Sequence, residues 1–436
     1  MMGVPAPLTP RDVPEEITPV QNLPPAITVC VIGLGYIGLP TAAVLAQAGN
    51  QVIGVDVNPA SVEAVNDGQV LFVEEGLATV VAGVVARGTL RAQTSTPEAD
   101  AYIISVPTPF GADHEADLSY IESAARGIAP QLHGGELIIL ESTSPPGTTA
   151  RVAEVILEAR PDLTQQPGLP GTVHFAHAPE RVLPGRIMIE MVANDRIIGG
   201  LTPEAAEMTR ALYSSFCHGE LLVTDARTAE MAKLTENAFR DVNIAFANEL
   251  SVIAERQGID VWELIELANH HPRVDILRPG PGVGGHCIAV DPWFIVSSDR
   301  ENSRLISTAR EVNDAKPEHV LRKALAAAAE HPHPTIAALG ITFKADVDDL
   351  RGSPAKDIVH ALARELTDGE ILVVEPNIDR LPPSFDRVPR VTLTGLEDGL
   401  ERADVVLLLV DHEPFKTVDV STLDGKAVID TRGLWR

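Results

Sequence analysis

The chain has few cysteines and no long apolar runs. Its 436 residues include only three cysteines, Cys30, Cys217 and Cys287. They are too few for a disulfide scaffold and lack the spacing of metal ligands. We therefore expect a reducing, cytoplasmic location and no bound metal. No apolar run approaches the ~20 residues needed to span a bilayer, and the N-terminus lacks the layout of a signal peptide, so no membrane association is expected.

Basic residues are also scarce. The sequence contains 34 Lys and Arg against 61 Asp and Glu, a formal net charge of −27. This balance argues against a general affinity for nucleic acid or for an anionic membrane surface. An anionic cofactor or substrate would need a site where a few Lys and Arg residues locally reverse that charge.

The chain is long enough for more than one domain. Residues 1–26 carry seven prolines and are typical of a disordered leader. From Ile27, short β-branched runs alternate with helical stretches, which predicts a first α/β domain over residues 27–224 with a parallel sheet covered by helices. Its candidate strands are Ile27–Ile32, Gln51–Asp56, Ala101–Val106, Leu137–Glu141 and Val173–Ala176.

A long helical segment then interrupts the alternation. One helix is expected from Asp225, its N-cap, to about Gln257, and another after Asp260. Residues 225–316 therefore form a central helical region, and residues 317–436 form a second α/β domain. The fold class is α/β, with two Rossmann-like doubly wound domains joined by the long helix. Candidate strands of the second domain are Thr335–Leu339, Ile371–Glu375, Val405–Val410 and Ala427–Asp430.

A dinucleotide-binding pattern follows the first strand. Gly33, Gly35 and Gly38 form G-x-G-x-x-G between a predicted strand and a predicted helix. Glycines at these positions let a pyrophosphate approach the N-terminus of the helix. Asp56 ends the next strand, where its carboxylate suits a ribose 2′-hydroxyl and repels a 2′-phosphate, so we expect NAD as the cofactor.

Two further loops follow strands of the same sheet and should lie at its carboxyl edge. They read Val106-Pro107-Thr108-Pro109 and Glu141-Ser142-Thr143-Ser144. Alone, either loop would be interpreted as a turn or a helix cap. Their position beside the glycine loop favours cofactor contact. The expected cofactor-binding residues are Gly33, Gly35, Tyr36, Ile37, Gly38, Asp56, Pro107, Thr108 and Thr143.

A glycine-rich loop that begins at Pro279 ends at Cys287. Free cysteines are usually small buried hydrophobic residues, and this interpretation suits Cys30 and Cys217. Cys287 lies among glycines and beside His286, which could lower the pKa of the thiol, and so is a candidate nucleophile. On the predicted long helix, Lys233 and Asn237 share one face. The sequence leaves open whether that face is solvated or buried.

The ordered motifs from Ile27 to Arg436 resemble the UDP-glucose/GDP-mannose dehydrogenase family. The resemblance implies an NAD-binding first domain, a central helix at a homodimer interface and a C-terminal domain that holds the UDP group of a UDP-sugar. The motifs are the glycine loop, Val106–Pro109, Ala178-Pro179-Glu180-Arg181, Lys233 with Asn237, the Cys287 loop, and Phe343-Lys344 followed by Asp349-Leu350-Arg351-Gly352-Ser353-Pro354.

The resemblance also implies individual roles in a four-electron oxidation of the sugar C6 alcohol. Cys287 would form the thioester, while Lys233 and Asn237 would stabilise oxyanions. Glu180 would activate water, and Asp291 would orient that water and Lys233. The implied substrate-binding residues are Arg181, Lys233, Asn237, Gly284, His286, Lys344 and Arg351, with Arg273 reaching over from the neighbouring subunit.

The residues of the loop that contains Cys287 indicate which UDP-sugar is the substrate. UDP-glucose-specific members resemble Gly-Gly-x-Cys-Phe-Pro-Lys-Asp there and carry a second glutamate after the first, whereas this chain has Val290 and Pro184 at those positions. The run from His271 to Phe294 is most similar to the UDP-N-acetylmannosamine dehydrogenases of the family, whose product feeds bacterial surface polysaccharides. Alternatives are a UDP-N-acetylglucosamine or UDP-glucose 6-dehydrogenase, a β-hydroxyacid dehydrogenase, and a non-catalytic nucleotide-binding protein.

Overall fold

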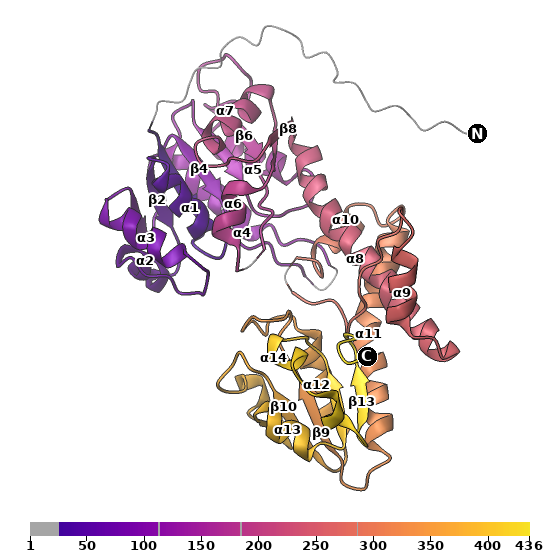
Figure 1. Cartoon of the computed structure of the whole chain (residues 1–436). Helices are drawn as coiled ribbons and strands as arrows, with labels where there is room; N and C mark the ends of the chain where they lie inside the picture. The colour runs from indigo at the N-terminus through magenta and orange to yellow at the C-terminus, as the bar shows by residue number, and fades with distance from the viewer. Residues whose placement is uncertain (1–25, 112–113, 184, 286) are drawn as a thin grey trace, which may run out of the picture. The chain divides into compact units, whose positions relative to one another are not determined.

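The computed structural model describes residues 26–436 except 112–113, 184 and 286 (Figure 1). The described chain divides into two compact units. The first comprises residues up to 109 together with 117–231, and the second comprises residues 110–116 and 232–436. The predicted leader lies outside the described residues apart from Ala26. Among the described residues, no helix is both long and apolar enough to cross a bilayer.

The first unit is built on an eight-stranded sheet in the order β3-β2-β1-β4-β5-β6-β7-β8. Neighbouring strands are parallel except β6 and β7, which pair antiparallel. The strands are β1 (Thr28–Ile32), β2 (Gln51–Val55), β3 (Leu90–Gln93), β4 (Ala101–Ile104), β5 (Leu137–Leu140), β6 (His174–His177), β7 (Arg196–Gly200) and β8 (Leu221–Asp225). The helices are α1 (Gly38–Gln47), α2 (Pro59–Asn66), α3 (Leu77–Ala86), α4 (Ser119–Ile128), α5 (Thr148–Ala159), α6 (Ile187–Ala193) and α7 (Pro203–Tyr213).

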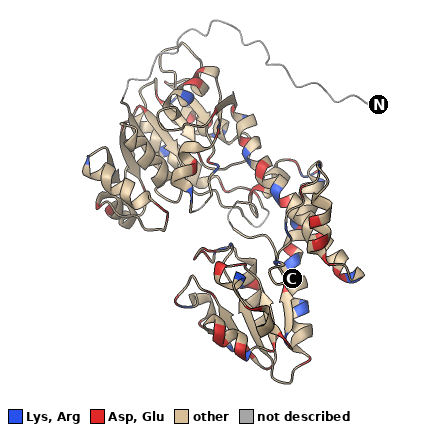
Figure 2. Ribbon diagram, viewed as in Figure 1, with Lys and Arg blue, Asp and Glu red and all other residues tan. Residues whose placement is uncertain are grey.

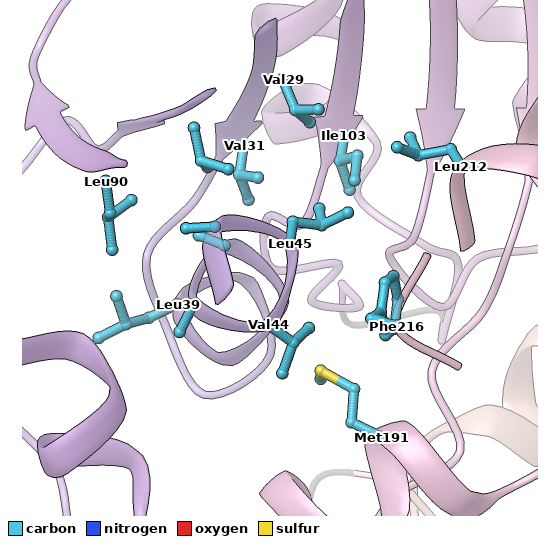
Figure 3. Close-up of a cluster of buried hydrophobic side chains, with 14 of the residues drawn as sticks. Val29, Val31, Leu39, Val44, Leu45, Leu90, Ile103, Met191, Leu212 and Phe216 are labelled. Carbon is cyan, nitrogen blue, oxygen red and sulfur yellow. The ribbon is translucent and has the colours of Figure 1, made fainter. Parts of the chain in front are cut away.

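Alternate residues of β1 enter two different hydrophobic cores. Val29 and Val31 pack against α1 (Figure 3), whereas Cys30 and Ile32 belong to a second cluster. Because successive side chains of a strand point to opposite faces, helices must cover both faces of this sheet. The doubly wound prediction is therefore confirmed for this unit, with the antiparallel β6–β7 pair as a departure from an all-parallel sheet.

The central helices agree with their predicted caps. α8 (Ala226–Gln257) begins after Asp225, whose carboxylate accepts the Thr228 N–H at 3.0 Å, and it ends before Gly258, which has φ +67°. Asp260 caps the next helix by accepting the Trp262 N–H at 2.8 Å. The remaining helices are α9 (Val261–Asn269), α10 (Asp291–Ser298), α11 (Arg304–Ala328), α12 (Pro354–Glu365), α13 (Leu396–Arg402) and α14 (Glu413–Lys416).

The second sheet is parallel, in the order β11-β10-β9-β12-β13. Ile336 and Ala338 of β9 enter one core, and Ala337 and Leu339 enter another, so this sheet is also covered on both faces. The predicted domain boundary between residues 316 and 317 falls inside α11, which continues to Ala328. The strands are β9 (Thr335–Leu339), β10 (Glu370–Val374), β11 (Val391–Leu393), β12 (Val405–Leu408) and β13 (Ala427–Asp430).

Four strands carry no clear signal in the sequence. β3 and β11 are short edge strands, and β8 is an edge strand whose Leu222 and Val223 are exposed. β7 contains Gly199 and Gly200, where an added Cβ would lie within 2.5 Å of backbone atoms. Edge strands and glycine-containing strands lack the continuous apolar pattern of a central parallel strand, which is why they were not predicted.

Candidate active site

The loop between β1 and α1 contains the three glycines of the predicted cofactor motif. Gly33 has φ +95°, and a Cβ there would lie 2.2 Å from the Ser105 carbonyl oxygen. A Cβ at Gly38 would lie 1.8 Å from the Gly33 carbonyl oxygen. The chain's own packing therefore requires glycine at both positions. At Gly35, no atom lies within 4 Å of such a Cβ, so the loop has room there for a ligand to approach α1.

Asp56 lies directly after β2, beside the same loop. Its carboxylate accepts hydrogen bonds from the backbone N–H of Leu34 at 2.9 Å and of Asn58 at 2.8 Å. These bonds hold the side chain at the carboxyl edge of the sheet, where the ribose lies in dinucleotide-binding folds. The open side of Gly35 and the fixed carboxylate together fit NAD.

Tyr36 and Ile37 lie within the glycine loop. The Tyr36 ring stacks on Phe72 with a centroid distance of 4.3 Å, and Ile37 occupies the N-cap position of α1. Both residues thus have a role in the local structure of the loop. Their contact with the cofactor stays a prediction.

The loops after β4 and β5 are tied together at this sheet edge by Ser142. Its Oγ accepts the Val106 N–H at 2.9 Å and donates to the Val106 carbonyl oxygen at 2.7 Å. The nearby Thr108 Oγ1 is buried and has no hydrogen-bond partner among the described residues. Leaving a buried hydroxyl unpaired is costly, and a bound ligand would offset that cost. Ser142 thus links the two loops, and cofactor contacts of Pro107, Thr108 and Thr143 stay predictions.

Glu180, the predicted water-activating group, is buried in the first unit. It forms an ion pair with Arg196, which is also buried, and its Oε1 accepts the Arg181 N–H at 2.7 Å. The Arg196 guanidinium lies over the rings of Tyr213 and Phe216, 5.1 and 5.5 Å from their centroids. Sequence reasoning missed Arg196, although an arginine at the start of an apolar strand is an unusual placement.

A second buried carboxylate, Glu141, belongs to the same group of side chains. It accepts hydrogen bonds from Thr41 Oγ1, at 3.1 and 3.0 Å, and from the Tyr213 hydroxyl at 3.3 Å. Burial raises the pKa of Glu141 to about 7, the negative charge of Glu180 adds to the rise, and Arg196 opposes it. Arg196 thus acts on both buried carboxylates: it forms an ion pair with Glu180, and its charge opposes the rise in the pKa of Glu141.

In the second unit, Lys233 and Asn237 lie on α8 facing the start of α10. Lys233 is buried, and the Asn237 Nδ2 donates to Asp291 Oδ2 at 2.5 Å. Burial raises the pKa of Asp291 to about 6, whereas the Lys233 charge and the Asn237 hydrogen bond lower it. A small hydrophobic cluster of Leu234, Ala238, Phe294 and Ile295 packs the two helices together. The face that the sequence left undecided is therefore a buried one.

Cys287 lies one turn before Asp291 and is joined to it through the backbone. The Asp291 N–H donates to the Cys287 carbonyl oxygen at 2.8 Å. Although the residue has exposed surface, the pKa of the thiol is raised, chiefly because the surrounding protein partly removes it from water. The negative charge of Asp291 raises this pKa further, and the positive charge of Lys233 lowers it. His286, which was expected to lower this pKa, lies outside the described residues. Cys30 and Cys217 are buried core residues, as expected.

The glycines before Cys287 pack against the segment that leads into α12. A Cβ at Gly284 would lie 2.4 Å from the Gly352 carbonyl oxygen, and one at Gly285 would lie 3.1 Å from the Phe343 ring. The Gly285 N–H donates to the Gly352 carbonyl oxygen at 3.2 Å. These close contacts with the chain itself account for glycine at both positions. Contact between Gly284 and the substrate stays a prediction.

Of the remaining predicted substrate-binding residues, Arg181 is half-buried and the others are exposed. Lys344 and Arg273 have exposed side chains, and the Arg351 guanidinium makes two hydrogen bonds to Asp349, at 2.9 and 2.7 Å. Arg181 donates to the Asp195 carbonyl oxygen at 3.2 Å. Figure 2 shows Asp and Glu spread over both units with Lys and Arg among them. Glu180 and Arg181 belong to the first unit. The second unit contains Lys344 and the side chains around Cys287, which are Lys233, Asn237 and Asp291.

Three family models match consecutive parts of the chain. Residues 27–217 match the NAD binding domain of the UDP-glucose/GDP-mannose dehydrogenase family, residues 227–315 match its central domain, and residues 337–436 match its UDP binding domain. The last match accounts for the second α/β domain, which the β-hydroxyacid dehydrogenase alternative left without a purpose.

Curated relatives are similar over nearly their whole length. An NDP-N-acetyl-D-galactosaminuronic acid dehydrogenase from Ralstonia nicotianae is 55% identical over 410 residues, covering 94% of this chain and 96% of the relative. A UDP-N-acetyl-D-mannosamine dehydrogenase from Escherichia coli K12 is 54% identical over 419 residues, covering 94% and 99%.

Solved structures show the same likeness. The UDP-N-acetyl-mannosamine dehydrogenase from S. aureus has a TM-score of 0.81 at 39% identity, and the UDP-D-ManNAc dehydrogenase from Pyrococcus horikoshii has a TM-score of 0.83 at 37% identity. Each comparison covers 94% of this chain and 96% of the other.

Proposed function

Because the chain belongs to the UDP-glucose/GDP-mannose dehydrogenase family and is an NAD-dependent UDP-sugar dehydrogenase, we propose that it oxidises the C6 alcohol of a UDP-linked 2-acetamido sugar to a carboxylate through a thioester on Cys287. The observation that carries this proposal is the gathering of Lys233, Asn237 and Asp291 around the Cys287 segment. A two-electron alcohol dehydrogenase has no need of a nucleophilic thiol, whereas oxidation to the acid has one.

In this mechanism the glycine loop and Asp56 would hold NAD, which would supply the hydride acceptor for two oxidation stages. The Cys287 sulfur adds to the C6 aldehyde, the carbonyl oxygen takes a proton, and oxidation of the resulting thiohemiacetal gives the thioester. Lys233 and Asn237 stabilise the negative charge that develops on the substrate oxygen. Because the pKa of Cys287 is raised, the thiol is protonated at neutral pH and must lose its proton for the addition.

Water then cleaves the thioester, which releases the carboxylate and returns the thiol. We assign the activation of this water to Glu180 and the orientation of Lys233 and water to Asp291. The ion pair with Arg196 and the hydrogen bond from the Arg181 N–H hold the Glu180 carboxylate in place beside the Ala178–Arg181 segment.

The acetamido group at C2 is supported by two kinds of observation. Val290 and Pro184 replace the lysine and the second glutamate that UDP-glucose-specific members carry near the reacting carbon. The names of the two curated relatives described above both specify N-acetylated sugars, one of manno and one of galacto configuration. We favour UDP-N-acetylmannosamine, because the sequence from His271 to Phe294 resembles the corresponding segment of the enzymes that act on this sugar. UDP-N-acetylgalactosamine, which the sequence did not suggest and which differs from it at C2 and C4, is the second candidate.

We further propose a homodimer that buries one side of α8. Phe239, Phe246 and Ile253 follow one another at seven-residue spacing on α8, and their exposed fractions are 70%, 51% and 43%. Such a stripe of large apolar side chains is typical of a helix that packs against a partner. In the dimer, Arg273 would reach the neighbouring site, while Lys344 and Arg351 contact the UDP-sugar within their own subunit.

The need for a free thiol and the nature of the product suggest where in the cell the enzyme works and what it serves. A thiol that must remain free for each turnover needs a reducing compartment, so we place the enzyme in the cytoplasm. A UDP-linked uronic acid is an activated building block, and we assign the enzyme to polysaccharide biosynthesis.

The experiment that tests the proposal counts NADH per sugar for four substrates. Purified protein is supplied with NAD and UDP-N-acetylmannosamine, UDP-N-acetylgalactosamine, UDP-N-acetylglucosamine or UDP-glucose. We expect two NADH per sugar and a kcat/KM for the best acetamido sugar roughly 10⁴ above that for UDP-glucose, because a pocket built for the amide leaves polar groups unpaired without it. One NADH with free aldehyde would rule out the thioester, and a preference for UDP-glucose would rule out the acetamido pocket.

A further inference from the structure

His412 is a buried histidine at the carboxyl edge of the second sheet. It follows β12 and lies opposite Glu375, which follows β10, and Thr342, which follows β9. The side chains of His412 and Glu375 are both 0% exposed, and His412 Nε2 lies 3.0 Å from Glu375 Oε2. The domain that contains them matches the UDP binding domain of the family. The carboxyl edge of a parallel sheet is where such folds bind ligands, so the buried His412–Glu375 pair lies close to the expected position of the UDP group.

The hydrogen bonds of His412 fix which ring nitrogen carries the proton. The backbone N–H of Asp346 points at Nδ1 over 2.9 Å. Since a backbone amide can only donate, Nδ1 must accept, and the proton of the neutral ring is on Nε2. Nε2 can then donate to Glu375 at 3.0 Å or to Thr342 Oγ1 at 3.2 Å.

These bonds hold the backbone on both sides of Lys344. Thr342 Oγ1 donates to the Lys344 carbonyl oxygen at 2.8 Å, and the amide two residues later, at Asp346, is held by His412. Asp346 has φ +60°, a left-handed conformation that is uncommon in residues other than glycine, although aspartate adopts it more readily than most. Its carboxylate also accepts the Glu413 N–H at 2.9 Å. The turn is therefore held from both its backbone and its side chain.

Glu375 anchors the start of the same segment. Its Oε2 accepts the Ile341 N–H at 2.8 Å, and its Oε1 accepts the Asn377 N–H at 3.2 Å. The Asn377 side chain in turn lies 3.0 Å from His412 Nδ1. Glu375 thus fixes the exit of β9, and His412 fixes the turn that follows it.

We propose that His412 is a positioning residue for UDP-sugar binding: by accepting the Asp346 N–H, it fixes the turn that presents Lys344 to the nucleotide. His412 is fully buried, so it acts through the backbone and not by touching the substrate. The inference rests on the proposed contact between Lys344 and the UDP-sugar.

The test replaces His412 with residues that lack or keep an acceptor at the Nδ1 position. His412→Leu leaves the Asp346 N–H without a partner, whereas His412→Asn places a side-chain oxygen close to the position of Nδ1. We expect the KM for the UDP-sugar and the Kd for UDP to rise roughly tenfold or more in the Leu variant and less than about threefold in the Asn variant. The KM for NAD should not change in either, because the NAD-binding motif lies in the other unit.

The matched control is His360→Leu in the same domain. His360 is a half-buried histidine that stacks on Phe385 and hydrogen-bonds to Ser384. We expect this variant to bind UDP like the wild type. If His412→Leu is folded and binds UDP normally, or if its KM values for both substrates rise together, the positioning role is wrong.

Two further variants keep the test decisive. If His412→Leu does not fold, UDP calorimetry on His412→Asn and His412→Gln replaces it, because only Asn keeps an acceptor near Nδ1 and should bind UDP more tightly. Equal affinity of the two variants for UDP would overturn the role of the acceptor.

Lys344→Ala tests the proposed contact between Lys344 and the UDP-sugar. If this variant binds UDP normally, both that contact and the role of His412 are wrong. Weak UDP binding by it, together with normal binding by His412→Leu, removes the inference alone.

Discussion

The Asn237 side-chain amide donates a 2.5 Å hydrogen bond to Asp291, 54 residues further along the chain. The bond ties the middle of α8 to the first turn of α10, directly after the Cys287 loop. As a result, one negative and one positive side chain, Asp291 and Lys233, act on the Cys287 thiol in opposite directions.

The reactivity of Cys287 should respond to these two charges with opposite signs. Asp291→Asn removes a charge that raises the pKa of the thiol, so alkylation by iodoacetamide at pH 7.5 should become faster. Lys233→Met removes a charge that lowers this pKa, so alkylation should slow. We expect changes of about threefold to tenfold, corresponding to a pKa change of up to about one unit. Mass spectrometry of the labelled protein over time measures both rates.

Cys287→Ser provides the background for that experiment. Cys30 and Cys217 are buried, so little label should enter this variant. If both charge variants change the rate in the same direction, the thiol does not experience Asp291 and Lys233 as the structure indicates.

Asp56 should decide between NAD and NADP. Asp56→Asn keeps one oxygen to accept the Leu34 N–H, loses the acceptor for the Asn58 N–H, and removes the charge that opposes a 2′-phosphate. The wild type should use NAD far more efficiently, and the variant should narrow the ratio of the two kcat/KM values by about tenfold, mainly through a gain with NADP. Initial rates with each cofactor measure this ratio. Equal use of both cofactors by the wild type would contradict the assignment.

Glu141 should make the stability of the first unit depend on pH. Burial raises its pKa to about 7 in the folded protein, against 4.5 for a glutamate side chain in water, so the folded state binds its proton more tightly. The penalty for ionising it is absent below pH 4.5, grows as the pH rises, and is complete above pH 7, at roughly 3 kcal/mol. Glu141→Gln avoids this penalty. The melting temperature of Glu141→Gln minus that of the wild type should therefore be larger at pH 8 than at pH 5.

Glu63→Gln, on the exposed side of α2, serves as the control for Glu141. Its melting temperature relative to the wild type should be the same at both pH values. Should Glu141→Gln behave in that way too, Glu141 would be ionised in the folded protein over the whole range.

The α8 stripe should control dimerisation. Phe246→Glu places a charge in the middle of the exposed apolar stripe, and we expect sedimentation to show a shift from dimer to monomer. Phe246→Leu, which keeps an apolar side chain, should remain a dimer. A wild-type protein that sediments as a monomer would remove the dimer proposal.

The position of Arg273 can be tested by mixing two inactive variants, Cys287→Ser and Arg273→Ala. In a mixed dimer, one site combines an intact Cys287 with an intact Arg273 from its neighbour only if the arginine acts across the interface. Equal mixing with exchange of subunits should then restore about one quarter of wild-type turnover, because half of the dimers are mixed and each has one good site of two. If Arg273 acts within its own subunit, mixing restores nothing.

The sequence was sufficient for the positions of the central strands along the chain, the long helix and the family. Val29–Ile32 and Ile336–Leu339 are continuous apolar runs, and the caps Asp225 and Asp260 lie next to the helices they begin. The G-x-G-x-x-G motif can likewise be read from neighbouring residues. These features depend on local patterns of spacing and residue type, which a linear sequence contains in full.

Only the tertiary structure decided how the charged side chains are paired. The ion pair of Glu180 with Arg196, the bond between Asn237 and Asp291, and the contact of His412 with Asp346 join residues on separate elements. The structure also showed that Gly284 is a glycine because the chain packs against it. Burial and pairing shift pKa values and fix conformations, and both depend on which distant segments meet in the fold, so no local pattern could reveal them.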